Sequence, residues 1–123
     1  MASTVPFKLI TPTKVVFDGD AELVIAVTTE GEEGILPHHA PLLAALKPGV
    51  VRANVVEQGK ALRLELATRE GFMQALPDRV TILVDEALRF DDVDVAKTRD
   101  ELAHATDQSA IDFATAKLRL TGH

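Results

Sequence analysis

Proline and glycine are confined to one part of the chain, and their distribution constrains the fold more than any other sequence feature. All six prolines, and every glycine except Gly122, lie before Ala87 in a chain of 123 residues. Both residue types interrupt helices and favour turns. From Asp91 onward the chain is rich in Ala, Leu, Asp and Lys, of which all but Asp are good helix formers. The sequence therefore predicts a β domain over residues 1–87 and a helical domain over residues 88–123.

Apolar residues in the first part recur at every second position, which is typical of strands that bury one face. The predicted strands are 7–9, 15–17, 22–29, 50–57, 62–66, 72–76 and 80–84. Turns are predicted at 11–13 and at 17–20, where Gly19 would supply a positive φ. Short strands with close turns predict an all-antiparallel sandwich or barrel. Its predicted core residues are Leu23, Ile25, Val27, Leu64, Leu66, Val80 and Ile82.

Two short helices are predicted in the second part, over residues 93–105 and 109–120. Asp91 and Asp92 suit the N-cap and first turn of the first helix, and Ser109 suits the N-cap of the second, with Asp112 at N3. The short link favours an antiparallel helical hairpin. Each helix would be only about 18 Å long and marginal alone. The apolar stripes must therefore pack on each other, on the β domain or on another protein. The predicted stripe positions are Val95, Ala96, Leu102 and Ala103, then Ile111, Ala114 and Leu118.

The stretch 31–49 holds three of the six prolines and three of the seven glycines, which argues against a plain helix or strand. It also carries five Ile and Leu residues, so we expect a structured loop held by its own apolar side chains. His38 and His39 could be metal ligands or acid–base groups. Consecutive residues on an extended chain point opposite ways, and the chain has no cysteine. We therefore expect exposed loop histidines rather than a metal site.

Composition excludes several classes of function. A net charge of −6 speaks against a nucleic-acid binder. No apolar run approaches the roughly 20 residues needed to cross a bilayer. The N-terminus has neither a basic head nor an apolar signal core, so we expect no signal sequence. There is no phosphate-binding loop, nucleophile motif or metal-ligand spacing. We expect a soluble, cytosolic, non-enzymatic protein without a cofactor, most simply a subunit of a larger assembly.

Several motifs resemble one family. Residues 31–43, read as Gly-Glu-x-Gly-Ile-Leu-Pro-x-His-Ala-Pro-Leu-Leu, resemble the hallmark of the epsilon subunit of the bacterial F-type ATP synthase. Residues 71–73 and 77–83 resemble the family's Gly-Phe-x-x-x-x-Pro-x-x-Val-Thr-Ile-Leu strand pair. Residues 85–87 resemble the end of its sandwich domain, and residues 92–94 the start of its first helix. The resemblance spans nearly the whole chain and implies a mainly β fold, an antiparallel β-sandwich followed by a C-terminal helical hairpin.

The resemblance also implies function and partners. Members sit in the central rotor stalk and couple rotation of the c-ring to ATP synthesis through the gamma subunit, without performing chemistry themselves. It implies contacts with gamma, with the polar loops of the c-ring and, through the hairpin, with the beta subunit. The location would be the cytoplasmic face of the bacterial inner membrane, as a peripheral part of the proton-translocating complex. Transferred by position, Glu32, His38, His39 and Pro41 would face the c-ring, although the family usually carries glycine at position 38.

A second transferred motif is degenerate. Some bacterial members bind ATP in the hairpin through Ile-Asp-x-x-Arg-Ala. Here Ile111, Asp112 and Ala116 keep the frame, but Thr115 replaces the arginine. We therefore expect weak ATP binding or none, and weak regulation of ATP hydrolysis because the second helix is short. A different class remains as an alternative, a free-standing β-sandwich that senses a nucleotide or another small ligand.

Overall fold

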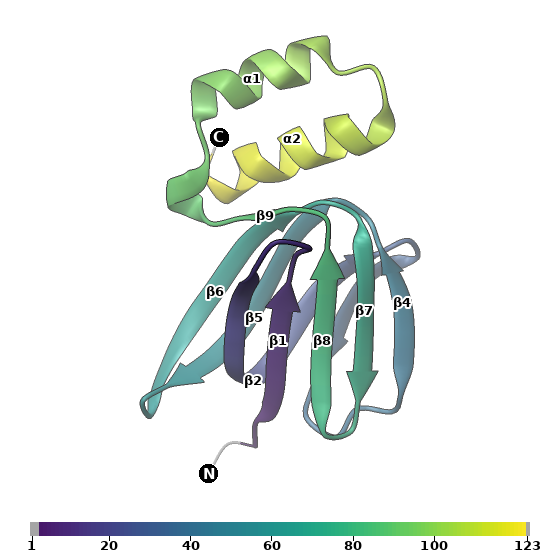
Figure 1. Cartoon of the computed structure of the whole chain (residues 1–123), viewed down its shortest axis with the longest axis vertical. Helices are drawn as coiled ribbons and strands as arrows, with labels where there is room; N and C mark the ends of the chain where they lie inside the picture. Colours follow the sequence, from purple (N-terminus) through teal and green to yellow (C-terminus); the bar gives the residue numbers. More distant parts are fainter. Residues whose placement is uncertain (1–2, 123) are drawn as a thin grey trace.

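The computed structural model describes residues 3–122 and consists of a β-sandwich with two helices lying across one end (Figure 1). The strands are β1 Val5–Ile10, β2 Val15–Thr28, β3 Gly31–Ile35, β4 Leu42–Leu46, β5 Gly49–Glu57, β6 Lys60–Thr68, β7 Gly71–Leu76, β8 Arg79–Val84 and β9 Ala87–Leu88. A single 3-10 turn, η1 Phe90–Asp92, then leads to α1 Val95–His104 and α2 Gln108–Leu120. The predicted order of a sandwich followed by a helical hairpin is confirmed.

The long strand β2 joins the two layers. Its first half pairs with β1, its middle with β5 and its last residues with β3. Figure 1 shows β1, β8, β7 and β4 in the front layer, while the other layer continues from β2 through β5 and β6 to β9. The pairing of β1 with β8 is parallel, so the expectation of wholly antiparallel pairing was wrong for this pair. Strand direction depends on the path of the chain, which the alternation of apolar residues does not reveal.

The turn predicted at 17–20 was wrong, because β2 runs through it without interruption. Gly19 pairs with Phe7 of β1 and is not among the described glycines with positive φ. A Cβ at Gly19 would lie 2.9 Å from the ring of Phe17, so the phenylalanine ring lies over the glycine. The two rings of Phe7 and Phe17 also pack together, with centroids 5.6 Å apart. Glycine here makes room for an aromatic side chain rather than a turn.

The predicted phase of β2 was also wrong. The ladder between β2 and β5 shifts register between Ala21 and Leu23, as a β-bulge does. Beyond the bulge, Val24 and Ala26 are fully buried, whereas the predicted core residues of this strand are only half-buried. Those half-buried residues are Leu23, Ile25 and Val27. The other four predicted core residues are buried as expected: Leu64, Leu66, Val80 and Ile82.

The stretch 31–49 is less irregular than expected. Strands β3 and β4 occupy most of it, because β2 and β7 supply ladder partners for them. Ile35 and Leu46 then enter the main core. A loop remains at 36–41, and residues 47–48 form a short link between β4 and β5. The prediction of a loop through the whole stretch was therefore wrong: its three prolines lie outside the strands, but Gly31 and Gly34 lie within β3.

Both helices begin at other residues than predicted. Asp94 caps α1 by accepting a hydrogen bond from Lys97 N at 3.0 Å, while Asp91 and Asp92 lie in η1. Asp107 caps α2 by accepting from Ala110 N at 2.8 Å. The predicted cap Ser109 therefore lies inside the helix, and Asp112 is not at N3. Asp and Ser cap helices about equally well, so a sequence with several candidates does not identify the cap.

The hairpin is folded onto the sandwich, with α2 packed on β5 and β6 and α1 packed on α2 (Figure 1). The stripe predicted for α2 is partly confirmed, because Ala114 and Leu118 are buried and Ile111 is half-buried. Phe113, which was not predicted, is the largest buried side chain of the helix. On α1, Ala96 and Ala103 are exposed, contrary to expectation. That helix has only one buried residue, Thr98, and Val95 and Leu102 are half-buried.

Candidate functional sites

The first site is the 36–41 loop, which lies at the end of the sandwich away from the helices. It leads into β4, whose first residue, Leu42, pairs with Ala75 beside the β7–β8 turn. The helices instead contact the opposite end of the sandwich, around Val50 and Ala67. Figure 1 shows the start of β4 and the β7–β8 turn together at the end remote from α1 and α2. A partner can therefore reach this loop without displacing the hairpin.

A tight turn sets the shape of this loop. The backbone N–H of His39 donates to Leu36 O at 3.2 Å, which places Pro37 and His38 at the two central positions. His38 has a φ of +66°, the value that a type II turn requires at its third position. Glycine is the residue that suits this position best, in line with the glycine that the family resemblance implies there. His38 is exposed and so is Pro41, two residues beyond the turn.

His39 is held by two neighbours. Its Nδ1 lies 2.6 Å from Ala40 O, and because a carbonyl only accepts, Nδ1 carries the proton and donates it. Its Nε2 lies 3.7 Å from Glu33 Oε1. The acid beside His39 is therefore Glu33, which the sequence analysis did not single out. The alternation of side chains along a strand would have separated Glu33 from Glu32.

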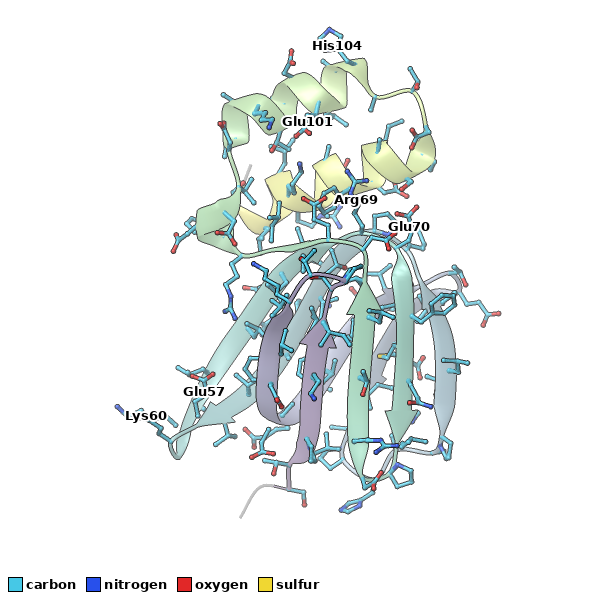
Figure 2. The ribbon with its side chains drawn as sticks, viewed as in Figure 1. Glu57, Lys60, Arg69, Glu70, Glu101 and His104 are labelled. Atoms are coloured by element: carbon cyan, nitrogen blue, oxygen red, sulfur yellow. The ribbon has the colours of Figure 1, made fainter. Side chains whose placement is uncertain are left out.

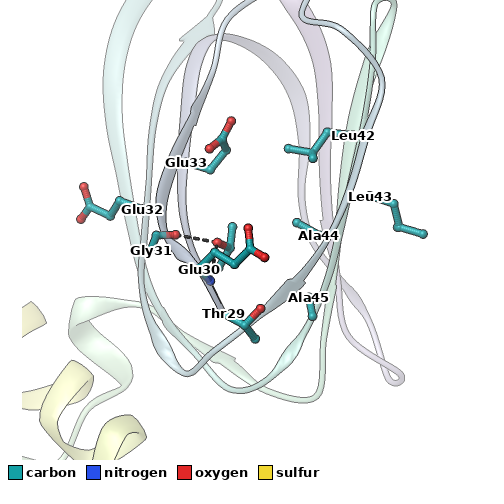
Figure 3. A pocket seen from close by; sticks show the side chains of 10 residues that line it. Thr29, Glu30, Gly31, Glu32, Glu33, Leu42, Leu43, Ala44 and Ala45 are labelled. Carbon is teal, nitrogen blue, oxygen red and sulfur yellow. Dashed lines mark hydrogen bonds between the residues drawn. The ribbon is translucent and has the colours of Figure 1, made fainter.

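Glu32 points to the other side of β3. Its carboxylate accepts a hydrogen bond from Arg52 Nη2 at 2.9 Å. Figure 3 shows the side chains of Glu32 and Glu33 pointing in opposite directions, as neighbours on a strand do. The structure thus brings together His39 and Glu33, but not His39 and Glu32. Within residues 3–122, no group of three or more His, Asp and Glu side chains is arranged to hold a metal ion.

A cavity of about 300 Å³ lies between the β2–β3 turn and β4 (Figure 3). The turn is fixed by Thr28, whose hydroxyl donates to Gly31 O at 2.7 Å and accepts from Glu30 N at 3.1 Å. Glu30 and Glu33 lie in its lining and Leu42 and Leu43 line the facing wall, while the carboxylate of Glu32, another lining residue, points away toward Arg52. The cavity is an acidic groove along the side of the sandwich.

The second site is the degenerate nucleotide motif on α2. The hydroxyl of Thr115 donates to Ile111 O of the preceding turn at 2.7 Å. Asp112 Oδ1 accepts from Gln108 Nε2 at 2.7 Å, and Ala116 is buried against the sandwich. The polar groups of the motif therefore form hydrogen bonds within their own helix. None of these contacts presents a cation to an incoming phosphate.

Two basic residues follow the motif. Lys117 turns inward and is only 7% exposed, with its Nζ 2.9 Å from Glu101 Oε1 of α1. A carboxylate thus already neutralises this lysine. Arg119 is exposed near the end of α2. Near the nucleotide motif, a phosphate would therefore meet one exposed cation, Arg119, on the last turn of α2.

The junction between hairpin and sandwich contains charged residues that the sequence analysis missed. Arg69, directly after β6, lies over the ring of Phe113 with Cζ 4.4 Å from the centroid. Its Nε also donates to Glu86 Oε2 at 3.0 Å. A hydrogen bond from Ser109 holds the pKa of Glu70 below its usual range, and the nearby Arg69 charge acts in the same direction. Figure 2 shows Arg69 and Glu70 at the end of the sandwich that faces α2.

Comparison with known proteins relates this architecture to one family. The β-sandwich domain of ATP synthase delta/epsilon chains matches residues 4–90. The ATP synthase epsilon chain of Desulforamulus reducens is 40% identical, over 98% of this chain and 92% of that one. The epsilon chain of Chromobacterium violaceum is 38% identical, over 89% of this chain and 79% of that one.

Solved structures with the same fold occur in mitochondrial assemblies. A chain from the central stalk and c-ring of the Tetrahymena thermophila ATP synthase superposes with a TM-score of 0.68 at 19% identity, over 98% of this chain and 95% of that one. A chain from the Euglena gracilis enzyme, in a structure of OSCP, F1 and c-ring, gives 0.66 at 19% identity, over 97% and 78%. At this identity the likeness concerns the fold. Within the described residues, neither helix is long and apolar enough to span a membrane.

Proposed function

The chain belongs to the family of ATP synthase delta/epsilon chains, and we propose that it works as the epsilon subunit in the central stalk of a bacterial F-type ATP synthase. The observation that carries this proposal is the extent of the similarity. The alignment with an epsilon chain covers 98% of this chain at 40% identity, so it includes the helical hairpin as well as the sandwich. The fold shared with chains of rotor assemblies supports the same assignment.

In this role the chain transmits rotation and performs no chemistry. A sandwich with one continuous, mostly aliphatic core resists deformation, because protein interiors are packed as densely as organic crystals. We propose that the 36–41 loop contacts the polar loops of the c-ring and that another face of the sandwich binds gamma. Rotation of the c-ring would then pass through a rigid body to the shaft and drive ATP synthesis. The subunit would lie on the cytoplasmic face of the inner membrane, attached only through the complex.

The 36–41 loop suits such a contact. His38 and Pro41 are exposed at its tip, and the turn at Leu36–His39 limits its flexibility. The hydrogen bond to Ala40 O orients His39, with Glu33 beside its Nε2, so its ring is already positioned before a partner arrives. Rigid polar groups lose little entropy when they form hydrogen bonds with a partner.

Co-purification tests the proposal. An affinity-tagged copy of the chain, expressed in its own host, should bring down the gamma subunit and the c-ring from detergent-solubilised membranes. A second test adds the purified chain to ATP synthase stripped of its epsilon subunit and measures ATP-driven proton pumping, which should be restored. Recovery of the chain alone, with no effect on pumping, would contradict the proposal and favour a free-standing sensor of a nucleotide or another small ligand.

A further inference from the structure

The contact between the hairpin and the sandwich is small. Its buried apolar cluster consists of Ala67, Phe113 and Ala116, with half-buried Val50, Leu88 and Leu120 around it. Two of the three buried members are alanines, so Phe113 is the one large apolar side chain of this cluster. Attachment of the hairpin therefore depends strongly on the surroundings of this one ring.

Two cations lie over that ring. The guanidinium of Arg69 is 4.4 Å from the ring centroid and the ammonium of Lys117 is 4.7 Å from it. Each cation also contacts an acid: Arg69 contacts Glu86 at 3.0 Å and Lys117 contacts Glu101 at 2.9 Å. These acids hold the two cations in place above the ring. Attraction between a cation and an aromatic face is strongest where water is excluded, and Phe113 is almost completely buried.

The two cations belong to different parts of the molecule. Lys117 and its partner Glu101 both lie on the hairpin, one on each helix, so their contacts persist if the hairpin moves as a unit. Arg69 and its partner Glu86 both lie on the sandwich side. The contact of Arg69 with Phe113 therefore crosses the boundary between the two parts. It is lost as soon as the hairpin leaves the sandwich.

We propose that Arg69 and Phe113 form a latch that holds the hairpin on the sandwich. A second contact at the start of α2, from Ser109 to Glu70, lies on the same boundary and supports the docked position. The latch is a property of the isolated chain. It goes beyond the proposed role in the ATP synthase, and its test does not depend on that role.

Thiol labelling measures the opening of this boundary directly, because the natural chain has no cysteine. The probe is Ala116→Cys, at a position buried between α2 and the sandwich that becomes accessible only when the hairpin lifts. The second probe is Ala75→Cys, in the sandwich core, which reports on global unfolding. Labelling rates with a small aromatic disulfide are measured for the full-length chain in each background.

In the probe chain, Arg69→Gln should raise the labelling rate at position 116 by about three- to thirtyfold, the range between an exposed and a desolvated cation–π contact, because the ring of Phe113 is buried but Arg69 is partly exposed. The rate at position 75 should remain unchanged. Arg79→Gln is the matched control, since it removes one arginine at the start of β8, at the far end of the sandwich, and should leave both rates unchanged. Equal rates in Arg69→Gln and Arg79→Gln would overturn the proposal.

A double-mutant cycle separates the latch from ordinary packing. Phe113→Leu keeps an apolar side chain of similar volume but removes the aromatic face. If the latch exists, Arg69→Gln should have little further effect on the rate at position 116 in the Phe113→Leu background, because its partner is already gone. Fully independent, multiplicative effects of the two substitutions would show that Arg69 and Phe113 do not act together and would also overturn the proposal.

Discussion

At the scale of single residues, His38 carries a conformational strain that the sequence alone did not indicate. Its φ of +66° lies in the left-handed region, which costs an ordinary L-residue about 1–2 kcal/mol. Glycine adopts this region freely, although it adds entropy to the unfolded chain. His38→Gly should therefore raise the free energy of unfolding by about 0.5–1 kcal/mol in urea titrations. His39→Gly serves as control and should destabilise, because it removes the contacts with Ala40 and Glu33.

Glu70 should make the stability of the chain depend on pH. The hydrogen bond from Ser109 lowers its folded-state pKa below the ordinary value of 4.5. A carboxyl whose pKa is depressed by folding stabilises the protein above its unfolded pKa and loses that contribution as the pH falls through the folded value. Glu70→Gln should therefore reduce the loss of stability between pH 6 and pH 3, as measured by urea unfolding. Identical slopes for the two proteins over this range would contradict the prediction.

At the scale of elements, the sequence predicted strands and helices well but their exact phases less well. The strands β5, β6 and β8 follow the alternation of their own residues, so their positions were predicted from local information. The bulge in β2 reverses which residues face inward, and it arises from the pairing with β5, far away in the sequence. Strand β9 has only two residues and forms because β6 offers it a partner. The bulge in β2 and the existence of β9 therefore depend on pairing between segments that are distant in the sequence.

The same distinction applies to the candidate sites. The turn signals around 36–41 predicted a loop there, and the motif at residues 31–43 identified His39. The pairing of His39 with Glu33 and of Glu32 with Arg52 depends on which face of β3 each acid occupies. Arg69 carried no signal of its own in the sequence. Its role depends on Phe113, which is 44 positions away and reaches it only through the docking of the hairpin.

The loop element gives a prediction about coupling. Glu32→Ala together with His39→Ala should weaken ATP-driven proton pumping relative to ATP turnover in reassembled membranes, while the isolated chain still folds. Because Glu32 pairs with Arg52 on one face of β3 and His39 lies beside Glu33 on the other, the two side chains share no partner and their separate effects should be additive. Glu57→Ala, an exposed acid at the β5–β6 turn, is the control. Unchanged coupling in the double variant would remove both residues from the proposed contact with the c-ring.

At the scale of the whole molecule, the candidate sites lie at two opposite ends of the sandwich. The 36–41 loop occupies one end of the sandwich and the hairpin covers the other (Figure 1). The hairpin end is closed by the Arg69–Phe113 latch, and Lys117, which follows the degenerate motif directly, is bound by Glu101. This arrangement favours a subunit whose hairpin remains docked while the sandwich rotates with its partners.

From this arrangement we predict that the chain binds ATP weakly or not at all. The planar guanidinium of arginine is the group best suited to bind phosphates. At the position where the motif has arginine, this chain has Thr115, whose hydroxyl already donates to Ile111 O. Lys117 is neutralised by Glu101, and the net charge of −6 disfavours a polyanion. Calorimetry of the isolated chain with ATP and Mg²⁺ should show no saturable heat at micromolar concentrations. A micromolar dissociation constant would contradict this prediction.

The docked hairpin also predicts weak inhibition of the assembled enzyme. To block catalysis, the hairpin would have to leave the sandwich, and α2 spans only Gln108–Leu120, which limits its reach to about 20 Å. Deleting residues 109–123 should therefore raise ATPase activity only slightly.

The matched variant Arg69→Gln frees the hairpin but keeps its length. It therefore separates the effect of the hairpin's position from the effect of its length. Suppose that the Arg69→Gln enzyme shows strongly reduced ATPase activity while the deletion changes the activity little. The hairpin would then be long enough to inhibit, and only its docking on the sandwich would prevent inhibition. A large rise on deletion would instead show that the hairpin already inhibits in its natural state.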